Sequence, residues 1–497
     1  MPLSVTGRSS PNVEPAKAGG IASGNRSPTL WTIVIAAAVL RLIALGRKSF
    51  WLDEIASVAI ARRPWPVLLH FLWHDEGNMA AYYLLLKPWL HFGYGEAAVR
   101  LLSVIAGILS VPLMYRLGTR LFGRQVGILS AALLAVSTCA ISVSQEARAY
   151  SFVVLLVVLS TSLFVQLIES PGYGLALAYG AAAGLTCYFH YFGVLVPAAH
   201  AVSVLALSAK QRPWKPLALA WTIIAALAAP ILWLMHAQDI GHLTWLQSPS
   251  WLELYHLGVF LAADGGKAVG AVLLALELVL AGFFVARFKT AWRDDSQRDK
   301  IDHLLRWRYA LVASAVATPI VITLLASIVR PAFYHRFLII CLPGWLLMIA
   351  LGAMQIRPRA ICITAIAAVC TLSLITTVLL YTRETEDWRA AVHYLMAHAS
   401  PQDRVLYYQP VGEFAGESYR EWLTPASAPY PLAVGVNPTH SDWKSSLAGA
   451  PRVWLVLYRT KPDDAEARAI EQDLNTRFAA ATEQKYAGIT VIEYQPR

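Results

Sequence analysis

Residues 47–65 read RKSFWLDEIASVAIARRPW and follow the first long apolar segment of the chain, Leu30–Leu45. This stretch contains an adjacent acidic pair, Asp53 and Glu54, set among aromatic residues. A carboxylate held at a membrane surface is partly withdrawn from water, which raises its proton affinity toward that of a general base. Acidic residues also complement the dipole at a helix N-terminus, so the pair could simply begin an interfacial helix. The residues alone allow both interpretations, one catalytic and one structural.

The chain around this stretch is far more apolar than a soluble protein. Of its 497 residues, 57% are hydrophobic and only 14% are charged. Apolar runs of about 17 to 25 residues, long enough to cross a bilayer, recur about eleven times between Leu30 and Tyr381. The sequence therefore predicts a polytopic α-helical membrane domain over residues 29–381, with a long outer loop at about 47–96. Two short amphipathic segments of that loop, Ile55–Arg62 and Trp65–Trp73, are typical of helices lying in the interface.

The charge distribution predicts the orientation of the spans. The net charge is +10, and basic residues gather in alternate loops, as at 116–124, 210–215 and 287–308. Loops rich in Lys and Arg are cytoplasmic as a rule. Residues 1–28 are rich in Ser, Pro and Gly and lack apolar periodicity, so they are predicted to be a disordered cytoplasmic leader. An odd number of spans then places the C-terminus outside.

Residues 382–497 are predicted to form a separate small domain on the outer face. From Arg383 onward the chain has 12 basic and 15 acidic residues, which leaves no electrostatic footprint for nucleic acid. Segments with helical spacing alternate with short apolar runs, a pattern that predicts a small α/β layer. The expected elements are helices at Glu386–Ala399 and Asp464–Ala479 and strands at Arg404–Tyr408, Arg452–Tyr458 and Gly488–Tyr494.

Ionisable and aromatic residues from five outer segments fall on one side of the membrane in this topology. Each has an ordinary explanation: arginines can anchor to lipid phosphates, tyrosines can belong to the interfacial belt, and a histidine can end a helix. Clustered ionisable groups at a membrane surface nevertheless indicate a functional site. The candidate residues are Asp53, Glu54, Asp75, Glu76, Tyr82, Glu146, Arg148, Tyr150, His190, Tyr191, His335 and Arg336.

Five motifs in register carry a resemblance to a known family. They are FWLDE (50–54), YYLLLKPW (82–89), SQEARAY (144–150), HYFG (190–193) and YHRFLIICLPGW (334–345). Over roughly residues 30 to 400, their order resembles the C-type membrane glycosyltransferases. The similar group comprises bacterial relatives of protein O-mannosyltransferases and of lipid A aminoarabinose and galacturonic acid transferases. Such relatives often have His-Pro-Pro before the paired tyrosines, whereas this chain has HDEGNMAAYY (74–83), so the acceptor side is expected to differ.

The resemblance implies transfer of a sugar from a polyprenyl-phosphate donor to an acceptor hydroxyl on the outer face of a bacterial inner membrane. Asp53 is the expected general base of an inverting displacement, with Glu54 beside it, and Arg148 and Arg336 are expected to bind the donor phosphate. The remaining candidates are expected to bind substrate. Metal dependence stays open, because Asp75, Glu76 and His190 could hold a divalent cation or bond to sugar hydroxyls.

Two other function classes fit a many-pass protein. A secondary transporter predicts charged residues near the midplane, matching broken helices in two halves and short outer loops. This chain has its charges at the outer interface, a long first loop and no visible internal repeat. A membrane scaffold whose tail binds a partner leaves the charged loop residues without a role.

Overall fold

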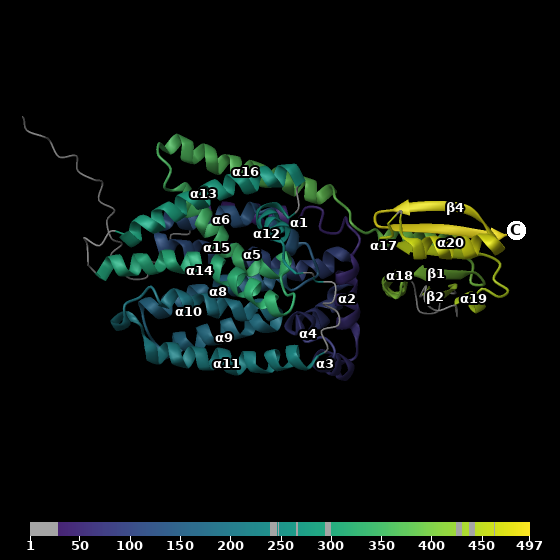
Figure 1. Cartoon of the computed structure of the whole chain (residues 1–497), viewed down its shortest axis with the longest axis horizontal. Helices are drawn as coiled ribbons and strands as arrows, with labels where there is room; N and C mark the ends of the chain where they lie inside the picture. Colours follow the sequence, from purple (N-terminus) through teal and green to yellow (C-terminus); the bar gives the residue numbers. More distant parts are fainter. Residues whose placement is uncertain are drawn as a thin grey trace, which may run out of the picture.

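The computed structural model describes residues 28–238, 246, 248–264, 267–293, 300–423, 430–436, 443–461 and 463–497. Apart from Pro28, the leader predicted at residues 1–28 lies outside the described residues. A bundle of long helices carries a small domain of strands and helices at one end (Figure 1). We call this end of the bundle the domain end.

The bundle confirms a many-pass helical membrane protein. Within the described residues, seven helices are long and apolar enough to cross a bilayer, and a bent helix pair makes up to eight. The long helices are α5 (Glu96–Phe122), α8 (Tyr150–Glu169), α11 (Trp214–Ala237), α13 (Lys267–Arg293), α14 (Lys300–Val329), η5 with α15 (His335–Cys341 and Leu342–Ala353) and α16 (Arg359–Thr382). Shorter helices of the bundle are α1 (Pro28–Leu42), α9 (Tyr173–Phe189), α10 (Leu195–Val204) and α12 (Trp251–Ala263).

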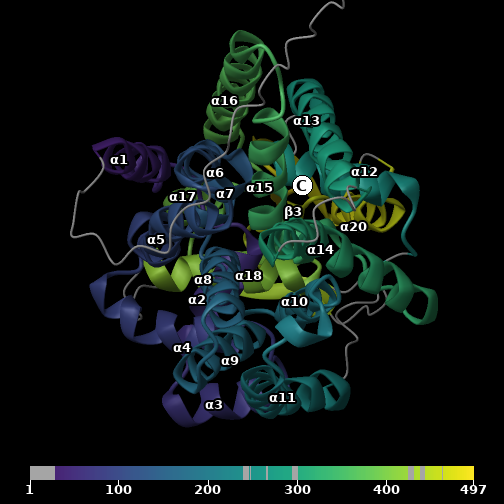
Figure 2. The same ribbon diagram turned by 90° about the vertical axis from the view of Figure 1, so that its left-hand side faces the viewer.

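The number of eleven spans is not confirmed, because several predicted spans are short helices. α1 has 15 residues and is about 22 Å long, less than the hydrocarbon thickness of a typical bilayer. The segment between α11 and α13 also contains a 13-residue helix, α12. Figure 2 views the bundle from its other end, with α15 near the middle and α16 at the edge. Every residue of α15 is buried, whereas only 22% of the most apolar stretch of α16 is buried.

One predicted span is broken. α6 (Arg124–Val136) and α7 (Thr138–Ser144) meet at Ser137 with a bend of 55°. A break inside a bundle frees backbone carbonyls that water does not reach. The buried Arg41 of α1 donates to the carbonyls of Leu134 (3.1 Å) and Ala135 (3.0 Å), so a side chain from another helix satisfies the break.

The loop between α1 and α5 contains three helices at the domain end, α2 (Leu52–Arg62), α3 (Trp65–His74) and α4 (Ala80–Trp89), followed by a short turn, η1 (Leu90–Phe92). α2 and α3 confirm the two short helices predicted there. On α3, Trp65, Leu69 and Trp73 recur every fourth residue and are about half exposed, as an interfacial helix requires.

The C-terminal domain is a five-stranded mixed sheet with helices, which confirms the predicted α/β class. The strand order is β2-β1-β3-β5-β4, in which β2, β1 and β3 are parallel and β5 and β4 are antiparallel additions. The strands are β1 (Arg404–Tyr408), β2 (Leu432–Val436), β3 (Val453–Tyr458), β4 (Phe478–Tyr486) and β5 (Ile489–Pro496). The helices are α17 (Trp388–His398), α18 (Pro410–Leu423), α19 (Trp443–Ser446) and α20 (Ala465–Arg477).

Candidate active site

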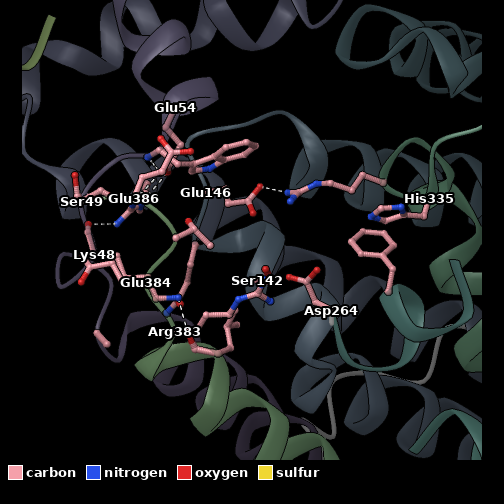
Figure 3. Close-up of a pocket in the computed structure, with 18 of the residues that line it drawn as sticks. Lys48, Ser49, Glu54, Ser142, Glu146, Asp264, His335, Arg383, Glu384 and Glu386 are labelled. Carbon is pink, nitrogen blue, oxygen red and sulfur yellow. Dashed lines mark hydrogen bonds and ion pairs between the residues drawn. The ribbon is translucent and has the colours of Figure 1, made fainter. Parts of the chain in front are cut away.

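A cavity of about 450 Å³ lies where the bundle meets the C-terminal domain. Its walls come from the segment after α1, the start of α2, α7, α12, the segment before α15, and the linker after α16. Figure 3 shows acidic and basic side chains from these elements converging on one space. The charged lining residues are Lys48, Glu54, Arg100, Glu146, Asp264, Arg336, Arg383, Glu384, Glu386 and Arg459.

Glu54 is fully buried and all its acceptor capacity is used. Its Oε1 accepts from the Nε of Arg100 (2.8 Å) and the backbone N–H of Ala147 (2.7 Å). Its Oε2 accepts from the Nη2 of Arg100 (2.7 Å) and the N–H of Trp51 (3.3 Å). Arg100 is also buried and donates to the carbonyls of Leu45, Lys48 and Ser49. This pair therefore fixes α2 against α5 and against the loop before α8.

Asp53, the neighbouring residue, has a different environment. Its Oδ2 lies 3.5 Å from the Nη2 of Arg148, and its side chain is 40% exposed against 13% for the arginine. Arg148 also approaches the Asp53 carbonyl and the Ser57 hydroxyl, at 3.4 and 3.5 Å. Asp53 is not among the residues that line the cavity, whereas Trp51 and Glu54 are. The Asp53 carboxylate is thus partly exposed and has Arg148 as a cationic partner.

A second ion pair, between Glu146 and Arg336, lies in the cavity wall. The guanidinium of Arg336 lies 5.4 Å from the centre of the Trp51 ring and 5.3 Å from that of Tyr150, so two aromatic faces hold it in place. Burial raises the pKa of the Glu146 carboxyl, and Arg336 opposes that rise. His335 also lines the cavity, and its ring contacts those of Tyr334 and Phe260.

Other predicted residues lie beside this group or apart from it. His190 is buried with its ring 5.8 Å from that of Tyr150, and burial, with a smaller effect of Arg148, lowers its pKa to about 3. Its Nδ1 accepts from the N–H of Phe192, so it is held as a neutral ring. Tyr82 is buried and bonded to Ser103, away from the cavity walls.

The HDEGN segment forms a separate polar contact. The Tyr191 hydroxyl donates to Oε1 of Gln238 (3.2 Å), and the backbone N–H of Tyr191 donates to Oδ1 of Asn78 (3.2 Å). The Glu76 carboxylate accepts from the N–H of Asn78, and Asp75 is exposed at the end of α3. These contacts join the α3–α4 turn to the ends of α9 and α11. None of these residues lines the cavity.

A divalent cation needs a group of oxygen or nitrogen ligands close together. Within the described ranges, no group of three or more His, Cys, Asp or Glu residues could hold a metal ion. Asp75, Glu76 and His190 therefore do not form the metal site that their side chains suggested.

Seven of the ten charged residues named above as lining the cavity were not identified as site residues from the sequence, among them Arg100, Glu386 and Arg459. Arg100 lies inside a predicted span, where an arginine needs a buried acidic partner, and that signal could have identified it. Glu386 opens the segment EDWRAAVHYL (386–395), which begins five residues after the last apolar run. Arg459 follows β3 in a left-handed conformation (φ 46°), which nothing in the local sequence indicates.

The chain is similar to known glycosyltransferases in sequence over part of its length and in fold over nearly all of it. Residues 77–236 match the family described as dolichyl-phosphate-mannose-protein mannosyltransferase. No curated protein sequence matches the chain.

Solved structures match over almost the whole chain. ArnT from Cupriavidus metallidurans bound to undecaprenyl phosphate matches with a TM-score of 0.60 at 13% identity, over 94% of this chain and 98% of that one. Its apo form matches with a TM-score of 0.62 at 14% identity, over 93% and 97%. The oligosaccharyltransferase of Archaeoglobus fulgidus matches with a TM-score of 0.55 at 11% identity, over 94% and 73%. The chain therefore has the fold of the C-type membrane glycosyltransferases.

Proposed function

We propose that the protein transfers a sugar from a polyprenyl-phosphate carrier to an acceptor hydroxyl. The observation that carries the proposal is the pairing of two arginines with two carboxylates, Asp53–Arg148 and Glu146–Arg336, beside one cavity of this fold. An anionic lipid headgroup needs cations at the membrane surface, and an acceptor hydroxyl needs a base. ArnT, which shares the fold, was crystallised with undecaprenyl phosphate, and this supports the choice of donor class.

The proposed reaction is a single displacement with inversion. The Asp53 carboxylate takes the proton of the acceptor hydroxyl as its oxygen forms a bond to the anomeric carbon. The bond between that carbon and the phosphate oxygen breaks, and the carrier phosphate leaves with the electron pair. One carboxylate base suffices, because no covalent sugar–enzyme intermediate forms. Asp53 suits this role better than Glu54, because its oxygens are partly exposed and those of Glu54 are all occupied.

Arg336 and Arg148 are proposed to bind the leaving phosphate, which gains charge in the transition state. Each already has a carboxylate partner, so the site is close to neutral before the donor binds. Arg336 lies in the cavity wall and is held by two aromatic rings, so it is the more direct candidate. Arg148 adjoins the base and would orient Asp53 as well as attract the donor.

We infer that the site faces outward from a bacterial inner membrane, with the N-terminus in the cytoplasm and the C-terminal domain outside. The basic loops at the opposite end of the bundle support this orientation. The acceptor is an envelope lipid, glycan or protein, and it reaches Asp53 from the aqueous side.

The test is mass spectrometry of envelope lipids, glycans and proteins from a deletion strain. We expect one hexose- or pentose-sized modification to disappear, to return with the wild-type gene and to stay absent with Asp53→Asn. An envelope unchanged by the deletion would contradict the proposal. Purified protein that fails to bind undecaprenyl phosphate would contradict the proposed donor class.

A further inference from the structure

The segment between α1 and α2 depends on other parts of the chain for its hydrogen bonds. This entry segment, Gly46–Leu52, leads directly to Asp53, and its residues from Gly46 to Trp51 belong to no helix or strand. Backbone N–H and C=O groups outside regular structure need other partners when they are buried. Arg100 of α5 supplies some of them, through the carbonyls of Lys48 and Ser49.

The C-terminal domain supplies most of the rest. Arg389 of α17 donates to the carbonyls of Gly46 (3.2 Å) and Arg47 (2.5 Å), and its backbone N–H donates to the Ser49 hydroxyl (3.2 Å). The hydroxyl of Tyr419, on α18, accepts from the N–H of Phe50 at 2.6 Å. The entry segment is therefore bound along its length by two helices of another domain.

Glu386 completes this contact at the first residue of α2. Its Oε2 accepts from the N–H of Leu52 (2.9 Å) and from the indole of Trp388 (3.0 Å). Its Oε1 accepts from the Tyr458 hydroxyl (2.9 Å) and lies 2.7 Å from the Nη2 of Arg459. The side chain is fully buried, and Figure 3 labels it among the side chains that line the cavity. A buried carboxylate with four partners has little freedom to move.

This bond takes the place of an ordinary helix cap. The first N–H groups of a helix have no partner within the helix, and the side chain at the N-cap position usually accepts from one of them. The N-cap of α2 is Trp51, which has no acceptor. Glu386, 334 residues later in the chain, accepts from the first of these groups instead.

We propose that the C-terminal domain is part of the active site, with Glu386 as the residue that positions the first turn of α2 and so Asp53. The effect on catalysis rests on the proposed function, whereas the effect on the entry segment does not. Asp53 follows Leu52 directly, so loss of this bond lets the carboxylate shift. A displacement of about 1 Å at a catalytic group can cost about 100-fold in rate.

The chain offers a matched control in Asp403. Its carboxylate is also fully buried and accepts from a tryptophan indole (Trp454, 3.0 Å) and a backbone N–H (Ser400, 2.8 Å), and it pairs with Arg452 at 3.0 Å. All these partners belong to the C-terminal domain. Asp403→Ala therefore removes the same chemistry from the same domain without touching the entry segment.

The first measurement is hydrogen exchange of the full-length protein in detergent, with no ligand added. We expect the peptide containing Leu52 to exchange at least tenfold faster in Glu386→Ala than in Asp403→Ala. Glu386→Gln keeps a carbonyl oxygen for the Leu52 N–H, and it should stay close to the wild type. Equal exchange of this peptide in Glu386→Ala and Asp403→Ala would overturn the proposal.

The second measurement separates positioning from a general structural effect. Glu386→Ala should lower the modification of the envelope in a complemented deletion strain by about 10- to 100-fold, at equal protein levels. Its binding of undecaprenyl phosphate should stay within about threefold of the wild type, because the arginines near the phosphate are unchanged, and Glu386→Gln should restore most of the modification. Normal modification in Glu386→Ala would overturn the positioning role. If the wild-type gene restores no modification, the proposed function fails instead, and exchange alone decides whether the domain holds the entry segment.

Discussion

Two adjacent residues, Asp53 and Glu54, have different environments at this site. Glu54 is buried with four hydrogen bonds, whereas the Asp53 side chain is 40% exposed and, in the part of the chain that the structure describes, pairs with Arg148. Asp53→Asn keeps the shape of the side chain and removes its ability to take a proton. Because general-base catalysis contributes about 100- to 10,000-fold, turnover should fall by that factor while expression and binding of undecaprenyl phosphate are retained. The assay is the rate of sugar transfer by the purified variant.

Glu54→Gln is the comparison for this variant, because its defect should be in stability. Removing one member of a buried ion pair costs about 3 to 5 kcal/mol, so this variant should unfold at a lower temperature or fail to accumulate. Near-normal transfer by Asp53→Asn, together with a stable but inactive Glu54→Gln, would show that the base was assigned to the wrong carboxylate. The enzyme class would survive that result.

Arg336 gives a prediction about donor binding. Arg336→Ala should weaken binding of undecaprenyl phosphate by about tenfold to a hundredfold, as expected for lost hydrogen bonds to a charged group. Arg336→Lys should retain binding only in part, because an ammonium cannot bind phosphate through the two parallel donors of a guanidinium. The exposed Arg330 is the matched control, and Arg330→Ala should bind normally. Unchanged binding by Arg336→Ala would remove this residue from the phosphate site.

His190 gives a prediction about pH. Burial lowers its pKa to about 3, whereas an unfolded histidine titrates near 6.5. Below pH 6.5 the unfolded chain therefore takes up a proton on His190 that the folded chain does not. The free energy of unfolding is thus unaffected by His190 above this pH and falls as the pH drops toward 3. The loss is about 2 kcal/mol at pH 5 relative to pH 8. Thermal unfolding at the two pH values should show this loss in the wild type and a smaller one in His190→Gln.

Among the elements, α6 and α7 show why a break in a span escapes prediction. Their combined sequence is mostly apolar, and the carbonyls beside the bend are bonded by Arg41, which lies 94 residues before Ala135. Within the described residues, Arg41 forms no salt bridge with a carboxylate; it donates to three carbonyls and to the Ser144 hydroxyl. Its role is to satisfy backbone oxygens that the bend has exposed.

Arg41→Met should therefore destabilise the bundle. It leaves the carbonyls of Leu134 and Ala135 without their donors, and each unsatisfied buried group costs about 1 to 3 kcal/mol. The midpoint of thermal unfolding in detergent should fall accordingly. Arg116→Met, at an exposed position of α5, should change it little. If both variants unfold at the wild-type temperature, the arginine does not stabilise the break.

The C-terminal domain shows a similar division between predictable and unpredictable elements. β1 has the predicted bounds, and β3 differs from the predicted strand by one residue, because buried apolar runs are visible in the sequence. β4 was missed because most of its residues are exposed, and because its first two residues, Phe478 and Ala479, were assigned to the preceding helix, which ends at Arg477. β2 and α18 were also missed. A strand that pairs on one edge and faces solvent on both sides has little apolar pattern.

At the scale of the whole molecule, the sequence predicts which residues share one end of the bundle, but not how they pair. Asp53 and Arg148 are 95 residues apart, Glu146 and Arg336 are 190 apart, and Leu52 and Glu386 are 334 apart. Periodicity and local spacing carry no information over such separations. The structure, and not the sequence, therefore separates the twelve candidates into groups. Some lie at the cavity, some lie beside it, and some belong to the separate contact around Tyr191 and Gln238.

Orientation in the membrane is the prediction on which the proposed reaction depends as a whole. The cavity, the entry segment and the C-terminal domain lie at one end of the bundle, so all of them face outward or none does (Figure 1). A cysteine at Lys485, whose side chain is 74% exposed on β4, should react with a membrane-impermeant maleimide in intact cells whose outer barrier is permeabilised. A cysteine at the exposed Lys289, near the other end of α13, should react only after lysis. The wild type supplies the background, because four of its five cysteines are buried. Labelling at Lys289 from outside would place the basic loop and the site on the wrong faces, and a lipid-linked sugar presented outside would then never meet Asp53.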